Sequence, residues 1–125
     1  MIVHCIDTET TGLYPHEGHE LVELAIITAA VNLDKRQPEI VILDELVTKI
    51  APAHLELAHP VALEVNGYNE LEWMGAPTFD ELIDAIRYHT SQGPVMGWNV
   101  SFDVNHINQA LLRAGQDTLS CRSID

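Results

Sequence analysis

The N-terminal stretch at residues 2–13 reads IVHCIDTETTGL, and the rest of the sequence is interpreted outward from it. Its first half, residues 2–6, is a short and largely apolar run of the kind that forms a buried strand. Two carboxylates, Asp7 and Glu9, follow where that strand would end. Because side chains two apart on a strand share a face, we expect both on one face, about 6.6 Å apart, with Thr8 on the other.

This pair of acids repels itself unless something neutralises it. At an effective dielectric constant near 20, two ionised carboxylates at this distance repel by roughly 2.5 kcal/mol. No Lys or Arg lies within ten residues on either side, whereas a divalent cation with oxygen ligands would turn the repulsion into attraction. The alternative is two solvated acids at a strand end, with Thr8 and Thr10 making turn contacts. The short Asp-x-Glu pattern alone favours that simpler interpretation.

Two further strand-like runs follow the first one. Residues 21–33 are rich in Val, Ile and Ala, and residues 40–50 have the β-branched content of a strand. The segment between them, residues 34–38, is polar and ends in Pro, as a hairpin loop does. Together the three runs predict an antiparallel meander of three strands.

A first clear helix is expected after residue 78. Thr78 and Glu81 form a capping box, with Thr78 as the N-cap. The apolar residues that follow recur at helical spacing: Phe79, Leu82, Ile83 and Ile86. Gly93-Pro94 ends this helix, and a weaker helix is expected earlier, over residues 60–65.

The last third of the sequence predicts a strand, a helix and the beginning of another strand. Residues 95–98 are typical of a short buried strand. Ser101 is placed to cap a helix that runs to about Ala114 and ends at Gly115, and residues 120–125 begin a last strand. The order β-β-β-α-α-β-α predicts an α/β layered domain, with a sheet of antiparallel and parallel strands flanked by helices.

Asp103 lies in the first turn of that last helix. It shares a stripe with the apolar positions that bury the helix, namely Ile107, Ala110, Leu111 and Ala114. The helix dipole favours an anion there by about 0.3–1 kcal/mol, which explains the position along the helix but not the inward facing. A buried acid needs a counter-charge or a metal. If strands 2–6 and 95–98 are parallel neighbours, Asp103 reaches the sheet end of Asp7 and Glu9.

Composition limits the classes of function. Nineteen acidic and six basic residues give this 125-residue chain, the length of one domain, a net charge of −13. This argues against wrapping of nucleic acid along a basic surface, but not against a local metal site that bridges acids and phosphates. No apolar stretch approaches the ~20 residues that span a membrane. Cys5 and Cys121 fit no metal pattern and are expected as free thiols, so we expect a cytoplasmic protein.

Two of these segments resemble motifs of the DnaQ-like, or DEDD, 3′–5′ exonucleases. Residues 7–13, DTETTGL, are similar to the first motif, and residues 99–103, NVSFD, are similar to the second. Residues 62–68, ALEVNGY, are similar to a short family helix that ends in Gly near the substrate. The resemblance covers almost the whole chain in the right order, and the two motifs together are specific. It implies a ribonuclease H-like fold and a single exonuclease-like domain over residues 1–125.

The resemblance also implies a reaction, the hydrolysis of nucleotides from the 3′ end of DNA or RNA, preferably single-stranded. Two Mg²⁺ or Mn²⁺ ions would be held by three catalytic carboxylates. Asp7 would bridge both ions, Glu9 would bind the ion that activates water, and Asp103 would hold the second. Two such ions about 4 Å apart stabilise the attacking and leaving oxygens of an in-line phosphoryl displacement.

Substrate contacts are implied in the same way. The turn backbone that would meet the terminal nucleotide consists of Thr10, Thr11, Gly12 and Leu13. Leu13 would pack against the base, and the alternative for it is an ordinary buried turn residue. Asn66 would also contact the substrate, although many relatives have His there. Asn99, in the second motif, would contact the substrate or only cap or brace the loop before the helix.

The third motif of the family has no counterpart after Asp103. It contains a His or Tyr followed by an Asp, and its His is the expected general base. His106 is expected on a different helical face, at the surface, and residues 123–125 resemble only the start of the strand that follows the second motif. We therefore expect a family member without its C-terminal helices, weakly active or inactive alone. An apolar sheet face left uncovered would favour a homodimer, or a polymerase or other partner chain.

Two other functions compete with the exonuclease. One is a non-catalytic DnaQ-like module that binds nucleic acid or protein, although such a relative would usually have lost one of the three acids, and none is lost. The other is a zinc-binding domain built on the loop residues His16, Glu17, His19 and Glu20. Their spacing matches no structural zinc pattern, so the exonuclease is the favoured interpretation.

Overall fold

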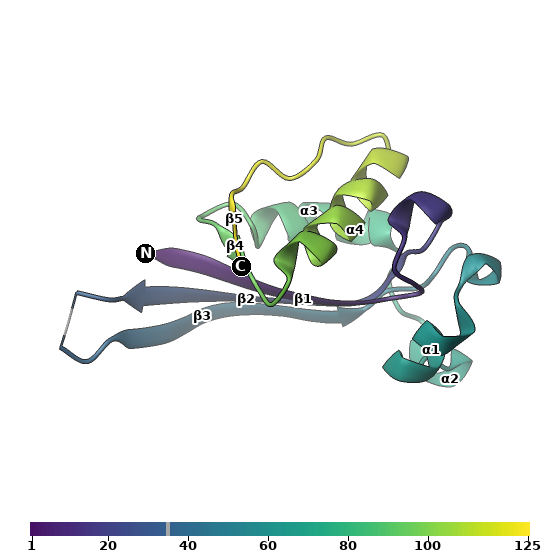
Figure 1. The fold of residues 1–125 in the computed structure, drawn as a ribbon, viewed down its shortest axis with the longest axis horizontal. Helices are drawn as coiled ribbons and strands as arrows, with labels where there is room; N and C mark the ends of the chain where they lie inside the picture. The colour runs from purple at the N-terminus through teal and green to yellow at the C-terminus, as the bar shows by residue number, and fades with distance from the viewer. Residues whose placement is uncertain (35) are drawn as a thin grey trace.

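The computed structural model describes residues 1–34 and 36–125, which form a mixed five-stranded sheet (Figure 1). The strands are β1 (Ile2–Thr10), β2 (Leu21–Asn32), β3 (Glu39–Lys49), β4 (Val95–Met96) and β5 (Ser123–Ile124). The helices are α1 (Pro60–Asn66), α2 (Glu70–Trp73), α3 (Phe79–Tyr88) and α4 (Val100–Arg113), with short 3-10 turns η1 (Pro15–Glu17) and η2 (Leu55–Leu57). The strand order β3-β2-β1-β4-β5 confirms the predicted α/β class.

The predicted meander is confirmed by the pairing of the first three strands. β1 pairs antiparallel with β2, and β2 pairs antiparallel with β3, whereas β4 is parallel to β1 and β5 is parallel to β4. Within the expected hairpin loop at residues 34–38, Lys35 lies outside the described residues. β1 is longer than predicted because its pairing with β2 continues beyond Ile6, through Thr8 opposite Leu24 and Glu9 opposite Glu23.

One face of the sheet is covered by α3 and α4, and the hydrophobic core lies between them (Figure 1). On the strands, Ile6, Leu24 and Ile26 are no more than 4% exposed. The helices contribute Leu82, Ile83, Ile86, Ile107 and Leu111, all buried. Burial of these helical positions confirms the stripes predicted from sequence spacing.

The helix ends agree with the sequence in part. Thr78 is the N-cap of α3, and its hydroxyl accepts a hydrogen bond from the backbone N–H of Glu81 at 3.4 Å, as predicted. Ser101 does not cap α4, so that prediction was wrong. The chain turns at Asn99, which has left-handed backbone angles (φ 53°, ψ 46°), and α4 therefore begins one residue before Ser101. Gly115, at φ 73°, follows the C-terminus of α4 as expected.

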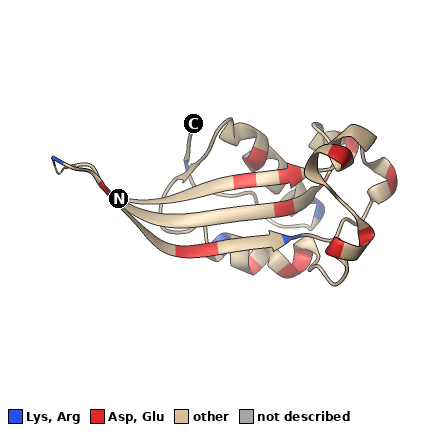
Figure 2. Ribbon diagram, turned by 90° about the horizontal axis from the view of Figure 1, so that it is seen from below, with Lys and Arg blue, Asp and Glu red and all other residues tan. Residues whose placement is uncertain are grey.

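The other face of the sheet is open. Figure 2 looks onto this face, where β1, β2 and β3 lie in front of α3 and α4. The edge strand β3 exposes a run of apolar side chains, Ile40, Val41, Ile42, Leu43 and Val47, and because successive strand residues alternate, these side chains are divided between the two faces of the strand. In the described part of the chain, no helix is long and apolar enough to cross a membrane.

Candidate functional site

The first two candidate acids lie near the end of β1, and alternating burial along the strand places their side chains on the open face. Asp7 is exposed and Glu9 is half-buried, whereas Thr8 between them is buried toward the helices. This alternation is the one that strand geometry predicted. Glu9 stands opposite Glu23 of β2, so a third carboxylate borders the pair.

Asp103 approaches the same part of β1 from the covered side. It lies in the first turn of α4 and is 4% exposed, which confirms the predicted inward facing. Its carboxylate accepts a hydrogen bond from the Thr8 hydroxyl, with 2.5 Å between the two oxygens. Since Thr8 lies between Asp7 and Glu9 along the strand, this bond fixes the helix carboxylate across β1 from the two strand carboxylates, within electrostatic reach of both.

The negative charges of these acids raise the pKa values of Glu9 and Asp103. The pKa of Glu9 is raised, first by burial and then by the negative charges of Asp7, Glu23 and Asp103. Burial raises the pKa of Asp103 too, the Thr8 hydroxyl opposes that change, and Asp7 adds to it. The site therefore carries more negative charge than its surroundings neutralise, which is the condition under which a cation binds.

The donor set fits Mg²⁺ or Mn²⁺ by its chemistry. All three side chains offer carboxylate oxygens, the ligands that hard divalent cations prefer, and a cation would relieve the repulsion just described. Their arrangement around Thr8 is open: among residues 1–34 and 36–125, no three His, Cys, Asp or Glu side chains are gathered closely enough to hold a metal ion as they stand.

The turn that follows β1 is tightly held. The Thr10 hydroxyl donates to the Gly12 carbonyl at 2.7 Å, and Thr11 is fully buried, with its hydroxyl accepting from the Glu20 N–H at 2.9 Å. Leu13 leaves the turn with its side chain 66% exposed. The alternative of a buried turn residue is therefore wrong for Leu13.

Leu13 borders a hollow of about 630 Å³ beside Glu9. Its lining is mostly apolar and comes from the turn, from α1 and from the start of α4, including Tyr14, Val61, Val65 and Phe102. A flat group that enters this hollow would lie beside the Glu9 carboxylate.

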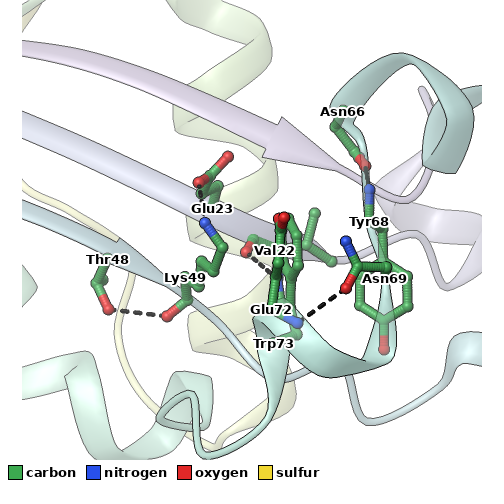
Figure 3. A network of polar contacts seen from close by, with 9 residues as sticks. All are labelled: Val22, Glu23, Thr48, Lys49, Asn66, Tyr68, Asn69, Glu72 and Trp73. Carbon is green, nitrogen blue, oxygen red and sulfur yellow. Dashed lines mark hydrogen bonds and ion pairs between the residues drawn. The ribbon is translucent and has the colours of Figure 1, made fainter.

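Both candidate asparagines brace backbone. The oxygen of Asn66 accepts from the Tyr68 N–H at 3.1 Å (Figure 3). The Asn66 amide donates to the Thr10 carbonyl at 3.0 Å, so α1 is attached to the turn after β1. Asn99 occupies the N-cap position of α4 without a side-chain bond to the helix backbone. Its oxygen instead accepts from the Ser101 hydroxyl at 3.4 Å, and its N–H donates to the Asp125 carboxylate at 2.7 Å.

Comparison with known proteins identifies the family. A family described as Exonuclease, RNase T, matches residues 4–125, nearly the whole chain. The chain belongs to this exonuclease family. No curated protein matches it by sequence.

Solved structures of exonucleases share the fold of this RNase T family member. The nuclease domain of 3'hExo, described as a DEDDh family member bound to rAMP, gives a TM-score of 0.70 at 14% identity, covering 95% of this chain and 62% of that one. A full-length 3′-exonuclease gives 0.63 at 17% identity, covering 90% and 52%. Cell-death related nuclease 4 gives 0.56 at 15% identity, covering 96% and 51%. The ribonuclease H-like fold is thereby confirmed, and the chain spans 51–62% of the length of these structures.

His106 of this exonuclease domain was predicted at the surface, and that prediction was wrong. Its side chain is 2% exposed, with Nε2 3.1 Å from the Gly12 carbonyl and Nδ1 3.1 Å from the Phe102 carbonyl. A residue three positions after Asp103 lies only about 60° away around the helix, close to the buried stripe. Both ring nitrogens face carbonyl oxygens, and the single N–H of the neutral ring donates to one of them, so His106 connects the start of α4 to the turn after β1.

The loop residues of the alternative zinc site serve the exonuclease fold in other ways. Nδ1 of His19 accepts from the Tyr14 N–H at 3.0 Å. The Glu20 carboxylate accepts from the backbone N–H groups of Ala53 and His54, at 2.9 and 2.5 Å. These two side chains therefore fix backbone turns, and they share no common centre with His16 and Glu17 among the described residues.

Proposed function

We propose that this chain carries the carboxylate core of a metal-dependent 3′–5′ exonuclease, which hydrolyses nucleotides from the 3′ end of DNA or RNA, preferably single-stranded. The observation that carries the proposal is the bond from Thr8 to buried Asp103. It joins acids from two distant parts of the chain beside an apolar hollow, in a member of the exonuclease family.

Each part of the site has a role in this proposal. Asp7, Glu9 and Asp103 would hold two Mg²⁺ or Mn²⁺ ions, and such ions supply stabilisation of the negative charge that develops on the attacking and leaving oxygens. The hollow beside Leu13 would receive the terminal nucleotide, with the leucine against its base. The hydrogen-bonded turn from Thr10 to Gly12 would keep its backbone fixed as the nucleotide binds.

Two structural neighbours support the class of ligand. One is described as bound to rAMP, and another by the 3′-end specific recognition of a histone mRNA stem-loop. The second gives a TM-score of 0.58 at 18% identity and covers 87% of this chain and 52% of that one. By analogy with them, we propose that a 3′-terminal nucleotide enters the hollow, because the flat face of its base would stack on the apolar lining and its phosphate would lie toward the acids.

We further propose that these 125 residues alone bind metal weakly and hydrolyse slowly. The sequence after Asp103 has no His followed by Asp at the spacing of the third motif. His106 is occupied by the Gly12 and Phe102 carbonyls. Without a positioned general base, a contribution of about 10²–10⁴-fold to the rate is absent.

The test is metal-dependent release of nucleotides from single strands labelled at either end. In the presence of Mn²⁺, we expect slow shortening from the 3′ end. Chelation of the metal and the Asp7→Asn substitution should each abolish this shortening, and Asp7→Asn should also weaken Mn²⁺ binding. Nucleic-acid binding that neither Mn²⁺ nor Asp7→Asn affects would favour the non-catalytic module instead. Fast degradation by the purified chain would contradict the missing general base.

The exposed apolar run of β3 supports a proposal on assembly. Five large apolar side chains on an edge strand, including Ile40 at 68% exposed and Val47 at 65% exposed, form a surface of the kind that pairs with another chain. We propose a second copy of this chain, with a polymerase or other partner chain as the alternative. Light scattering at increasing concentration is expected to show dimers, and a monomer at high concentration would contradict the second copy.

A further inference from the structure

A row of three charged side chains crosses the open face of the sheet next to the candidate metal site. The strand registers place Glu9 of β1 opposite Glu23 of β2, and Glu23 opposite Lys49 of β3. In Figure 2, acidic segments lie near the end of β1 and the start of β2, and a basic segment lies at the end of β3. Glu23 also lines, together with Asp7 and Glu9, a hollow of about 220 Å³ on this face.

The ammonium group of Lys49 is held in place on two sides. Its Nζ lies 3.2 Å from Oε1 of Glu23 and 4.6 Å from the centre of the Trp73 ring, which is within the range of a cation–π interaction (Figure 3). Both members of the ion pair are about two-thirds covered, with side-chain exposures of 35% and 34%. This pair is therefore better shielded from water than a fully exposed surface ion pair.

Trp73 is itself fixed, so it acts as a rigid wall for the ammonium group. The indole is 5% exposed, its Nε1 donates to the Val22 carbonyl at 2.9 Å, and the Tyr68 ring lies 5.0 Å away, centre to centre (Figure 3). Val22 precedes Glu23 on β2, so the same strand supports the ring and supplies the carboxylate.

If the ion pair were broken, each partner would change the charge at the candidate metal site. Without Lys49, Glu23 would be an unpaired carboxylate beside Asp7 and Glu9. Without Glu23, the ammonium group of Lys49 would be free to pair with Glu9, the next acid in the row. Two other basic side chains are bonded elsewhere: Arg87 donates to the Asp117 carbonyl, and Arg113 to the Pro15 carbonyl.

We propose that Lys49 and Glu23 are positioning residues for the metal site. Lys49, held against Trp73, keeps Glu23 from acting as a fourth metal-facing carboxylate, and Glu23 keeps the ammonium group away from Glu9. The pair thereby sets how much negative charge the cations meet. This inference rests on the proposed function, since it assumes that Asp7 and Glu9 bind a divalent cation.

The test measures the affinity of the intact chain for Mn²⁺ alone, by electron paramagnetic resonance of the free ion. Lys49→Met removes a positive charge and releases Glu23, so the expected result is roughly three- to tenfold tighter Mn²⁺ binding. Glu23→Gln is expected to weaken binding by a similar factor, because the ammonium group then competes at Glu9. The double variant is expected near the wild type, and Lys49→Arg, which keeps charge and pairing, is expected to leave the affinity unchanged.

A matched control separates local from overall charge. Arg122→Met removes one positive charge from an exposed side chain next to β5, near the start of the parallel strands and away from the acids, and it is expected to leave Mn²⁺ affinity unchanged. A thermal melt of each variant shows whether it is folded. A structural role alone would lower the melting temperature of Lys49→Met without tightening Mn²⁺ binding.

Three results would overturn the inference, and they differ from each other. If the wild type binds Mn²⁺ and Lys49→Met binds it equally or more weakly, the pair does not set the charge of the site, and the proposed function stands. If Arg122→Met tightens binding as much as Lys49→Met, the effect is not local. If the wild type binds no Mn²⁺, the proposed function fails and this inference fails with it.

Discussion

The two faces of one sheet differ in what they contribute to the protein. On the covered face, Ile6, Leu24 and Ile26 are almost completely buried under α3 and α4. On the open face, the neighbouring residues Asp7 and Glu9 remain accessible and repel each other. Because successive side chains of a strand point to opposite faces, the residues that stabilise the fold lie on one face and the candidate site acids of β1 lie on the other. The Thr8 hydroxyl connects the two faces by its bond to Asp103.

The largest expected effect compares adjacent residues of β2. Ile26→Ala removes a side chain with 0% exposure from the covered face, so we expect a loss of about 3 kcal/mol of unfolding free energy. Ile27→Ala, on the open and half-buried side, is expected to cost less than about 1.5 kcal/mol. Urea denaturation of both variants measures the difference. Equal losses would show that both faces are packed alike.

The next effect tests whether the covered side also holds the turn after β1. His106→Ala removes the contacts to the Gly12 and Phe102 carbonyls and leaves a cavity, so we expect about 2 kcal/mol of destabilisation. His16→Ala, at an exposed position, is the control and should change stability by less than about 0.5 kcal/mol. If the two substitutions cost the same, His106 does not hold the turn.

Two buried histidines, His4 and His106, should make the stability of the protein depend on pH. Burial lowers the pKa of His4 and of His106 below the ordinary value of 6.5. Below pH 6.5 the unfolded chain therefore binds more protons than the folded one, and stability falls as the pH falls, by at most about 1.4 kcal/mol per pH unit for each histidine. Urea denaturation between pH 7.5 and 5.5 measures this slope.

A smaller change in stability, with the opposite dependence on pH, is expected from the buried acid Asp103. Because the pKa of Asp103 is raised, first by burial, its ionised form costs stability above its ordinary pKa of 3.8. Asp103→Asn keeps an oxygen acceptor for Thr8 and removes the charge, so we expect a gain of about 1 kcal/mol at pH 7 together with loss of Mn²⁺ binding. A destabilised Asp103→Asn variant would mean that the charge is compensated within the fold.

The smallest effect is expected on the edge strand. Ile42→Thr replaces a 53% exposed side chain on β3 with another β-branched one, so the stability of the monomer should change by less than about 0.5 kcal/mol. Thermal denaturation of dilute protein checks this value. A loss as large as that of Ile26→Ala would show that β3 is covered in solution.

Local sequence patterns predicted most of the fold. The apolar runs gave the three strands of the meander, because each is long enough to be recognised without knowledge of its neighbours. The Thr78 cap and the helical spacing after it gave α3. Asp103 was placed correctly because its own helix carries a buried stripe that begins with it.

What the sequence could not give depends on contacts between distant residues. Asp7 and Glu9 have no Lys or Arg within ten residues, yet Lys49 reaches Glu23, next to Glu9, from 26 residues farther along the chain. His106 was misplaced although helix geometry puts it near the buried stripe, and its partner, the Gly12 carbonyl, is 94 residues away in sequence. Strand register decides the contact between Lys49 and Glu23, and single-strand periodicity does not contain register. The packing of α4 against the turn after β1 decides the contact of His106 with Gly12.

The backbone conformation of Asn99 is enough to explain why an asparagine stands at this position of the motif. Its left-handed angles reverse the chain between β4 and α4, and only Gly, Asn and Asp adopt them at little cost. Its side chain is not needed to cap the helix. The asparagine that opens the segment NVSFD is therefore explained first by its backbone conformation. This conformation sets the direction of α4, so that the acid four residues later lies above β1.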